Sequence, residues 1–286
     1  MINRILVTGA NGQLGLELKQ VFNKQHYTVF YTDISELDIT NVEIIRLFVN
    51  SNDINLIINC AAYTAVDKAE DEAEKANLVN HIAVHNLSEV VKERGIRLIH
   101  ISTDYVFSGN SLFPYSETDG TNPIGIYGKT KLEGEKAVIS KNIQYIIIRT
   151  SWLYSSFGSN FAKTILRLAN ERDSLKVIYD QIGTPTYAAD LARAIVSILN
   201  ADNWHSGIYH YTNEGVTSWY DFALAIIDIA GLGAKINPCR TEEYPTKAKR
   251  PHFSVLDKEK FKLQYGIKIP HWRESLVECI NQISKN

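Results

Sequence analysis

Short apolar runs alternate with amphipathic stretches along the first half of the chain. The runs lie at residues 2–7, 27–32, 56–60, 97–101 and 145–149. Between them, apolar side chains recur every three to four positions, which is the spacing of one helix face. Strands that alternate with helices predict right-handed crossovers. The run at 56–60 is almost wholly apolar, as in a sheet covered on both faces. The pattern therefore predicts an α/β fold with a doubly wound parallel sheet.

After residue 150 the alternation becomes less regular. We expect helices at 161–170, 190–199 and 218–230, strands at 175–178 and 208–211, and two later helices near residues 257 and 273. Residues 1–150, with 175–200 returning to them, are predicted to form the sheet domain. Residues 151–174 and 201–286 are predicted to form a smaller C-terminal substrate-binding lobe. Such a lobe would cover the carboxyl ends of the strands, where ligands of open α/β sheets bind.

Composition and charge narrow the class of protein. The 286 residues are 45% hydrophobic and 22% charged, which is ordinary for a soluble globular protein. A net charge of -2 gives no reason to expect nucleic acid or an anionic membrane as a partner. The chain has no apolar run of membrane-spanning length, and its start lacks the shape of a signal peptide, so we expect a cytoplasmic protein. Cys60, Cys239 and Cys279 lack metal-ligand spacing and are expected to be free thiols.

Three glycines follow the first apolar run. Gly9, Gly12 and Gly15 are three positions apart, and an apolar helix face begins at Leu14. A strand that turns into a helix points free N–H groups and a positive dipole end beyond the turn. Glycines there let a pyrophosphate approach the backbone and let the helix pack on the strand. Residues 1–150 therefore read as a Rossmann-type dinucleotide-binding domain.

An acidic residue ends the second apolar run. Asp33 lies 18 residues after Gly15. A carboxylate at this place can accept hydrogen bonds from the adenosine ribose hydroxyls. The alternative is a solvated loop aspartate. Asp33 disfavours a 2′-phosphate, yet no arginine follows it directly, so the sequence leaves NADPH or NADH open as the cofactor.

Three residues suit hydride-transfer chemistry beside such a cofactor. Tyr127 and Lys131 are four positions apart at the start of a predicted helix, so they share one face. The ammonium and an oxidised nicotinamide would lower the phenol pKa from its usual value near ~10. Lys131 can also hold the nicotinamide ribose. Thr103, at a strand end, can donate a hydrogen bond to a carbonyl oxygen as that oxygen gains charge. The alternative is an ordinary surface helix.

The chain resembles the extended short-chain dehydrogenase/reductase family over its whole length. The motifs that carry the resemblance are TGANGQLG at 8–15, AAYTAVDKAE at 61–70, STDYVF at 102–107, YGKTK at 127–131, RTSWLY at 149–154, DQIGTPT at 180–186 and KRP at 249–251. The resemblance implies NADPH- or NADH-dependent reduction of the C4 keto group of a dTDP-linked sugar. It also implies a catalytic triad of Thr103, Tyr127 and Lys131.

The same resemblance implies the rest of the site. The cofactor-binding set is Gly9, Asn11, Gly12, Gln13, Leu14, Gly15, Asp33, Asp38, Ile39, Ala62, Tyr63, Thr64, Tyr127 and Lys131. The substrate-binding set is Val66, Thr103, Asp104, Tyr105, Trp152 and Arg250. Trp152 would flank the sugar or the thymine, or else plug the space between the lobes. Arg250 would meet the diphosphate, or else form an ordinary surface ion pair.

Only a few residues distinguish the related activities that occur on the same scaffold. A nucleotide-sugar dehydratase usually carries an Asp-Glu pair after the threonine, whereas Thr103 is followed by Asp104 and Tyr105. A 4-epimerase needs only the same triad, and a non-catalytic regulatory subunit would need none of it. Some family members dimerise through a magnesium site of glutamates, and Glu17 sits where one ligand would lie. The other ligands have no match, so we predict no metal and either a monomer or a homodimer.

Overall fold

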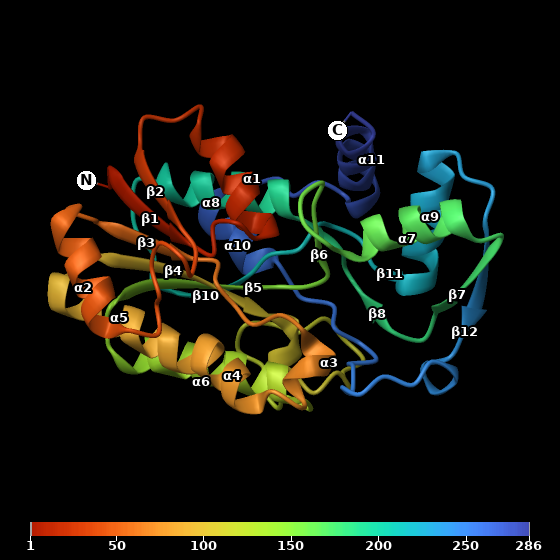
Figure 1. Cartoon of the computed structure of the whole chain (residues 1–286), viewed down its shortest axis with the longest axis horizontal. Helices are drawn as coiled ribbons and strands as arrows, with labels where there is room; N and C mark the ends of the chain where they lie inside the picture. Colours follow the sequence, from red (N-terminus) through yellow and green to blue (C-terminus); the bar gives the residue numbers. More distant parts are fainter. Residues whose placement is uncertain (1, 286) are drawn as a thin grey trace.

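Six parallel strands form the central sheet of the computed structural model, which describes residues 2–285 (Figure 1). Their order is β10-β5-β4-β3-β1-β2, and every neighbouring pair is parallel. The strands are β1 (Arg4–Thr8), β2 (Thr28–Thr32), β3 (Leu56–Asn59), β4 (Arg97–Thr103), β5 (Gln144–Thr150) and β10 (Gly207–His210). The predicted α/β class with a Rossmann-type sheet is confirmed.

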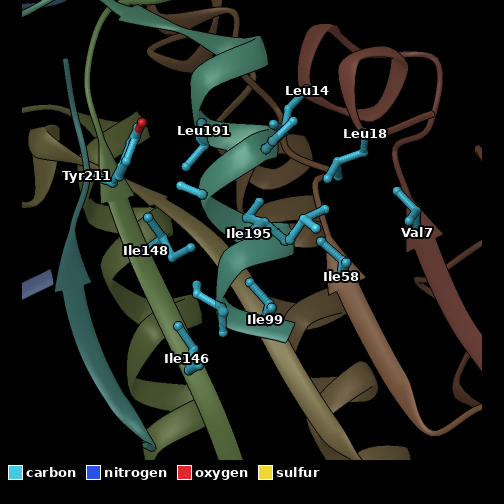
Figure 2. Packing of buried hydrophobic residues seen from close by; sticks show 14 of the residues in the cluster. Val7, Leu14, Leu18, Ile58, Ile99, Ile146, Ile148, Leu191, Ile195 and Tyr211 are labelled. Atoms are coloured by element: carbon cyan, nitrogen blue, oxygen red, sulfur yellow. The ribbon is translucent and has the colours of Figure 1, made fainter. Parts of the chain in front are cut away.

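Helices cover both faces of this sheet. Helices α2 (Val42–Ser51), α5 (Ala83–Arg94) and α6 (Ile126–Ser140) lie on one face, and α1 (Gln13–Phe22), α8 (Ala188–Leu199) and α10 (Glu259–Tyr265) on the other (Figure 1). Successive strand residues point to opposite faces. Ile5 and Val7 therefore pack with α1 and α8, and Leu6 packs with α2 and α5. Figure 2 shows Leu14 and Leu18 of α1 beside Ile195 of α8 over the sheet strands.

A second lobe lies beside the sheet, at the right of Figure 1. It contains α7 (Phe161–Glu171), α9 (Trp219–Ala230) and α11 (Trp272–Ile283), together with the strand pairs β7 (Ser174–Ile178) with β12 (Lys235–Cys239), β8 (Ile182–Gly183) with β11 (Thr217–Ser218), and β6 (Leu153–Tyr154) with β9 (Thr186–Tyr187). Its core is separate from that of the sheet and includes Phe222, Ile226 and Leu276, all fully buried.

The division between sheet and lobe differs from the expected one at three segments. Strand β7 pairs with β12 in the lobe, and of residues 175–200 it is α8 that returns to the sheet. In β7, buried Leu175 and Val177 alternate with exposed Ser174 and Lys176, so it has one apolar face and does not suit the interior of a doubly covered sheet. Conversely, β10 and α10 lie within 201–286 but pack with the sheet.

The helical segment between β3 and β4 is interrupted. It consists of α3 (Val66–Ala69), α4 (Ala73–Asn77), a π-helical turn η1 (Leu78–Ile82) and α5. Within the π turn, the side chain of Asn80 bonds both backbone polar groups of Tyr63, at 2.8 Å and 3.1 Å. It also donates to the hydroxyl of Thr130 on α6. Tertiary hydrogen bonds therefore accompany the irregular turn, which joins the loop after β3 to α6.

Two short 3-10 turns each follow the end of a strand. Turn η2 (Asp104–Val106) directly continues β4, and η3 (Thr241–Glu243) follows β12. The hydroxyl oxygen of Thr103 accepts a hydrogen bond from the backbone N–H of Tyr105 at 3.2 Å. This cap fixes the direction in which the chain leaves β4.

Candidate active site

A cleft of about 700 Å³ runs along the carboxyl ends of the strands and reaches the second lobe. The predicted site residues that line it are Gly9, Gly12, Gln13, Leu14, Gly15, Asp33, Asp38, Ile39, Ala62, Thr64, Val66, Thr103, Asp104, Tyr105, Tyr127, Lys131 and Trp152. Asn11, Tyr63 and Arg250 are predicted site residues that are not part of this lining. The fold therefore gathers predicted residues from positions 9 to 152 in one cleft.

The glycine turn at one end of the cleft is too tight for side chains. Gly9 has φ +65°, and a Cβ there would lie 2.6 Å from the backbone nitrogen of Ala61. A Cβ on Gly15 would lie 2.6 Å from the Cα of Ala10. Gly12 is the N-cap of α1 and provides no capping side chain. The first-turn N–H groups of α1 therefore face the cleft without a capping side chain, which fits a pyrophosphate.

Asp33 lies where β2 ends, beside this turn. Its Oδ2 accepts the backbone N–H of Asn11 at 3.1 Å, and its Oδ1 accepts that of Ile34 at 2.8 Å. Each carboxylate oxygen can accept more than one hydrogen bond, so both oxygens can still take ribose hydroxyls. Asn11 contributes through its backbone, which orients Asp33. Asp38, further along the cleft, accepts both the N–H and the hydroxyl of Thr40.

Tyr63 is placed differently from its neighbours in the loop after β3. Its hydroxyl donates to the carboxylate of Glu72 at 3.1 Å, and its backbone is bound by Asn80. Ala62 and Thr64 on either side line the cleft, whereas Tyr63 does not. The side chain of Tyr63 is therefore held by Glu72, the residue that precedes α4.

Thr103, Tyr127 and Lys131 all line the cleft. Thr103 ends β4, and the other two occupy successive turns of α6. Burial raises the pKa of Tyr127 to about 12, while the Thr103 hydroxyl acts to lower it. The Lys131 ammonium donates to the carbonyl of Ile101 at 2.7 Å. The expected lowering of the Tyr127 pKa by Lys131 is not found, because burial dominates and Thr103 is the group that opposes it.

Asp104 is a buried carboxyl at the wall of the same cleft. Its side chain is 2% exposed, and its Oδ1 accepts a hydrogen bond from the Thr103 hydroxyl at 2.9 Å. Its Oδ2 contacts no hydrogen-bond partner within residues 2–285. Burial raises the pKa of Asp104 to about 7. Tyr105, the next residue, packs edge-on against Tyr127 with ring centroids 5.5 Å apart. A polar ligand can therefore satisfy the free oxygen of Asp104.

Trp152 stands between the cleft and the second lobe. Its backbone has φ +47°, in the left-handed region that non-glycine residues rarely adopt. Its indole stacks on that of Trp219, with the ring centroids 3.5 Å apart and an angle of 9° between the ring planes. On another side, a Cβ on Gly183 would lie 2.7 Å from the indole. Trp152 thus lines the cleft and packs against the lobe, and its contact with the sugar or the thymine stays a prediction.

Arg250 forms an ion pair away from the cleft lining. Its guanidinium donates twice to the carboxylate of Asp67, at 3.1 Å and 2.6 Å. The ion pair that was the alternative reading of Arg250 is therefore present, with Asp67 at the start of α3 binding both terminal nitrogens of the guanidinium. The contact of Arg250 with a diphosphate stays a prediction.

Several residues around the cleft escaped the sequence reasoning. Trp219 and Asn160 both line it, and the amide of Asn160 donates to the side-chain oxygen of Gln13 at 2.9 Å. Both come from the second lobe, at positions outside the motifs named in the sequence. Glu135 was also missed, although it follows Lys131 by one helical turn and that spacing is readable in the sequence.

Residues 2–285 contain neither a metal-binding cluster nor a helix able to cross a membrane. There is no cluster of three or more His, Cys, Asp or Glu side chains able to hold a metal ion. No helix in that part of the chain is both long and apolar enough to cross a membrane. Glu17 is buried, and its carboxylate accepts a hydrogen bond from the Ser155 hydroxyl at 2.6 Å.

Known proteins to which this chain is similar belong to one family. The family model described as RmlD substrate binding domain matches residues 3–285. A dTDP-4-dehydrorhamnose reductase of Aggregatibacter actinomycetemcomitans is 44% identical over 285 residues, which cover 96% of this chain and 97% of that protein. A crystal structure of a dTDP-4-dehydrorhamnose reductase from Clostridium acetobutylicum superposes with a TM-score of 0.95 at 45% identity, covering 98% of this chain and 99% of that one. One from Bacillus anthracis, in complex with NADP, has a TM-score of 0.95 at 39% identity and covers 99% and 100%.

Proposed function

This chain belongs to the RmlD substrate binding domain family, and we propose that Thr103, Tyr127 and Lys131 perform the reduction in its cleft. The reaction is the reduction of the C4 keto group of dTDP-4-dehydro-6-deoxy-L-mannose (dTDP-4-dehydrorhamnose) to dTDP-L-rhamnose. It is the last step of dTDP-rhamnose biosynthesis. The cofactor is NADPH or NADH, which supplies the hydride when bound.

The glycine turn and Asp33 are suited to hold the dinucleotide. The first-turn N–H groups of α1 would bind the pyrophosphate. Asp33 would accept hydrogen bonds from the adenosine ribose. Lys131 would hold the other ribose through two N–H donors, since its ammonium has three and one is used by Ile101.

Tyr127 is the proposed proton donor. Because burial holds its pKa near 12, the phenol keeps its proton at neutral pH and can deliver it to the C4 oxygen as that oxygen gains charge. Thr103 would donate a second hydrogen bond to the same oxygen. Its hydroxyl has one proton, which the structure shows directed at Asp104, so donation to the sugar requires the hydroxyl to turn.

The wall beyond the triad is proposed to hold the sugar nucleotide. Val66, Asp104, Tyr105 and Trp152 all line the cleft on this side. The free Oδ2 of Asp104 can accept a hydrogen bond from a sugar hydroxyl, and the indole of Trp152 offers a flat apolar surface.

The observation that carries the proposal is the convergence of the triad and the glycine turn in one cleft. The direct test is to incubate the protein with dTDP-4-keto-6-deoxy-L-mannose and NADPH or NADH, follow loss of nicotinamide absorbance, and identify the product. We expect one dinucleotide oxidised for each dTDP-L-rhamnose formed. Sugar interconversion without net oxidation would indicate an epimerase. Dinucleotide binding without turnover would indicate a regulatory subunit.

A further inference from the structure

Three side chains follow one another at four-residue intervals along α6. Tyr127, Lys131 and Glu135 therefore share one helix face. Glu135 is 1% exposed and does not line the cleft, so it cannot touch a ligand there. A buried carboxylate one turn behind a catalytic lysine calls for a physical explanation, because burying a charge is costly unless it is paired.

The carboxylate of Glu135 is fixed by donors from two strands. Arg149 of β5 donates to it twice, from Nε at 2.9 Å and from Nη2 at 2.6 Å. The Ser102 hydroxyl of β4 donates to its Oε1. Three donors, two of them on one guanidinium, stabilise the ionised carboxylate. Glu135 thus ties α6 to the ends of the strands that flank the triad.

Lys131 needs such a charge nearby. It is 1% exposed, and its hydrogen bond within the protein is to the carbonyl of Ile101. Burial lowers the pKa of Lys131 to about 8, and the carboxylate of Glu135 is the first group that acts against this. Without Glu135 the ammonium would lose its proton at a lower pH.

The other titratable groups around Lys131 do not replace Glu135. They are Cys60 after β3, His100 in β4, Asp104 in η2, Tyr127 on α6 itself and Arg149 in β5. Burial raises the pKa of Cys60 to about 12 and that of Tyr127 to about 12, so both are neutral near pH ~7. Burial holds the pKa of His100 well below its usual value, so it is neutral too. Asp104 raises the pKa of Tyr127 and does not shift that of Lys131, and Arg149 is a cation, so it cannot do the work of a carboxylate.

We propose that Glu135 is a positioning residue for the reduction, whose buried carboxylate keeps Lys131 protonated and holds α6 against β4 and β5. The inference rests on the proposed function, because it gives Lys131 its place beside the ribose. Glu135 acts through Lys131 and through Ser102, which precedes Thr103.

The test is an NMR titration of Lys131 in protein made with isotopically labelled lysine, with the signal assigned from Lys131→Met. In Glu135→Gln we expect the titration midpoint of Lys131 to fall by about one pH unit. The alkaline limb of kcat/KM should move down by the same amount. Glu135→Asp keeps the charge and should retain most of the wild-type midpoint. Glu133→Gln is the matched control, since Glu133 lies on the same helix in an exposed pair with Lys136.

A second variant covers the case in which Glu135→Gln does not fold because Arg149 is left unpaired. Glu135→Gln with Arg149→Met removes both charges of the buried pair, a change that proteins often tolerate. The midpoint of Lys131 should again fall, but by less than in Glu135→Gln, because the loss of the Arg149 cation acts in the opposite direction. An unchanged midpoint in either folded variant would overturn the inference. Failure of the wild-type enzyme to reduce the keto sugar would instead count against the proposed function, because the NMR titration does not depend on turnover.

Discussion

Tyr127 is half-buried at the first turn of α6, and burial of its phenol raises the pKa and keeps it protonated at neutral pH. It can therefore act as an acid in the direction of reduction. We expect Tyr127→Phe to lower kcat by about 10²- to 10⁴-fold, the usual contribution of a positioned proton donor. Dinucleotide affinity should be unchanged, since only the hydroxyl is lost. Steady-state kinetics with a fluorescence titration of NADH measures both, and near wild-type kcat would show that another group donates the proton.

The carboxyl of Asp104 links the site to stability. Burial raises its pKa to about 7, whereas in an unfolded chain the value is near ~3.9. Between these two values the native state keeps a proton that the unfolded state has lost, so stability falls as pH rises through this window. Above it, the protein contains a buried and incompletely paired charge.

The variant Asp104→Asn removes that charge. We expect it to be more stable than wild type by about 2 kcal/mol near pH ~8 and to match wild type near pH ~4. Thermal melts at the two pH values measure the difference. A stability change that is the same at both would contradict the raised pKa.

The sequence predicts the placement of a side chain where a local motif sets the geometry. It does not predict a contact whose two residues are far apart in the chain. The spacing of Tyr127 and Lys131 on one helix face is set by the helix itself, so the sequence sufficed. Arg250 binds Asp67, which is 183 positions away, and nothing in the local sequence of either residue identifies the other. Trp219 was missed for the same reason, since its stacking partner Trp152 lies in another segment.

Among the elements, α1 owes its position to Gly15. A Cβ at this residue would lie 2.6 Å from both the Cα and the carbonyl oxygen of Ala10, so α1 would have to move away from the turn. We expect Gly15→Ala to weaken NADH binding at least tenfold and to destabilise the fold by about 1–3 kcal/mol. Gly120→Ala is the control, because a Cβ there meets nothing within 4 Å. Calorimetry and thermal melts compare the two, and equal behaviour would refute the role of the turn.

Strands and helices were readable where one period dominates. Both faces of β3 are buried, and a strand of this kind is a continuous apolar run, so the sequence of β3 predicted it. The π turn η1 was not readable, since it coincides with long-range hydrogen bonds of Asn80 with Tyr63 and Thr130. Strand β7 has a readable period, but its partner β12 could not be deduced from it.

At the scale of the whole molecule, two separate cores meet at the cleft. The stack of Trp152 on Trp219 connects the end of β5 to the start of α9 in the lobe. We expect Trp219→Ala to free Trp152 and raise KM for the keto sugar about tenfold, the size of one aromatic contact. NADH affinity should stay the same, because Trp219 is on the lobe side. Separate KM and Kd measurements test this, and an unchanged KM would show that the stack does not shape the sugar site.

We propose that hydride passes to C4 of the keto sugar in this cleft. Nicotinamide dinucleotide deuterated at its transferable position, with NMR of the sugar product, measures this transfer. We expect deuterium at C4 of dTDP-L-rhamnose in proportion to the dinucleotide oxidised, and loss of this transfer in Tyr127→Phe. A product without deuterium at C4, or dinucleotide that is never oxidised, would contradict it.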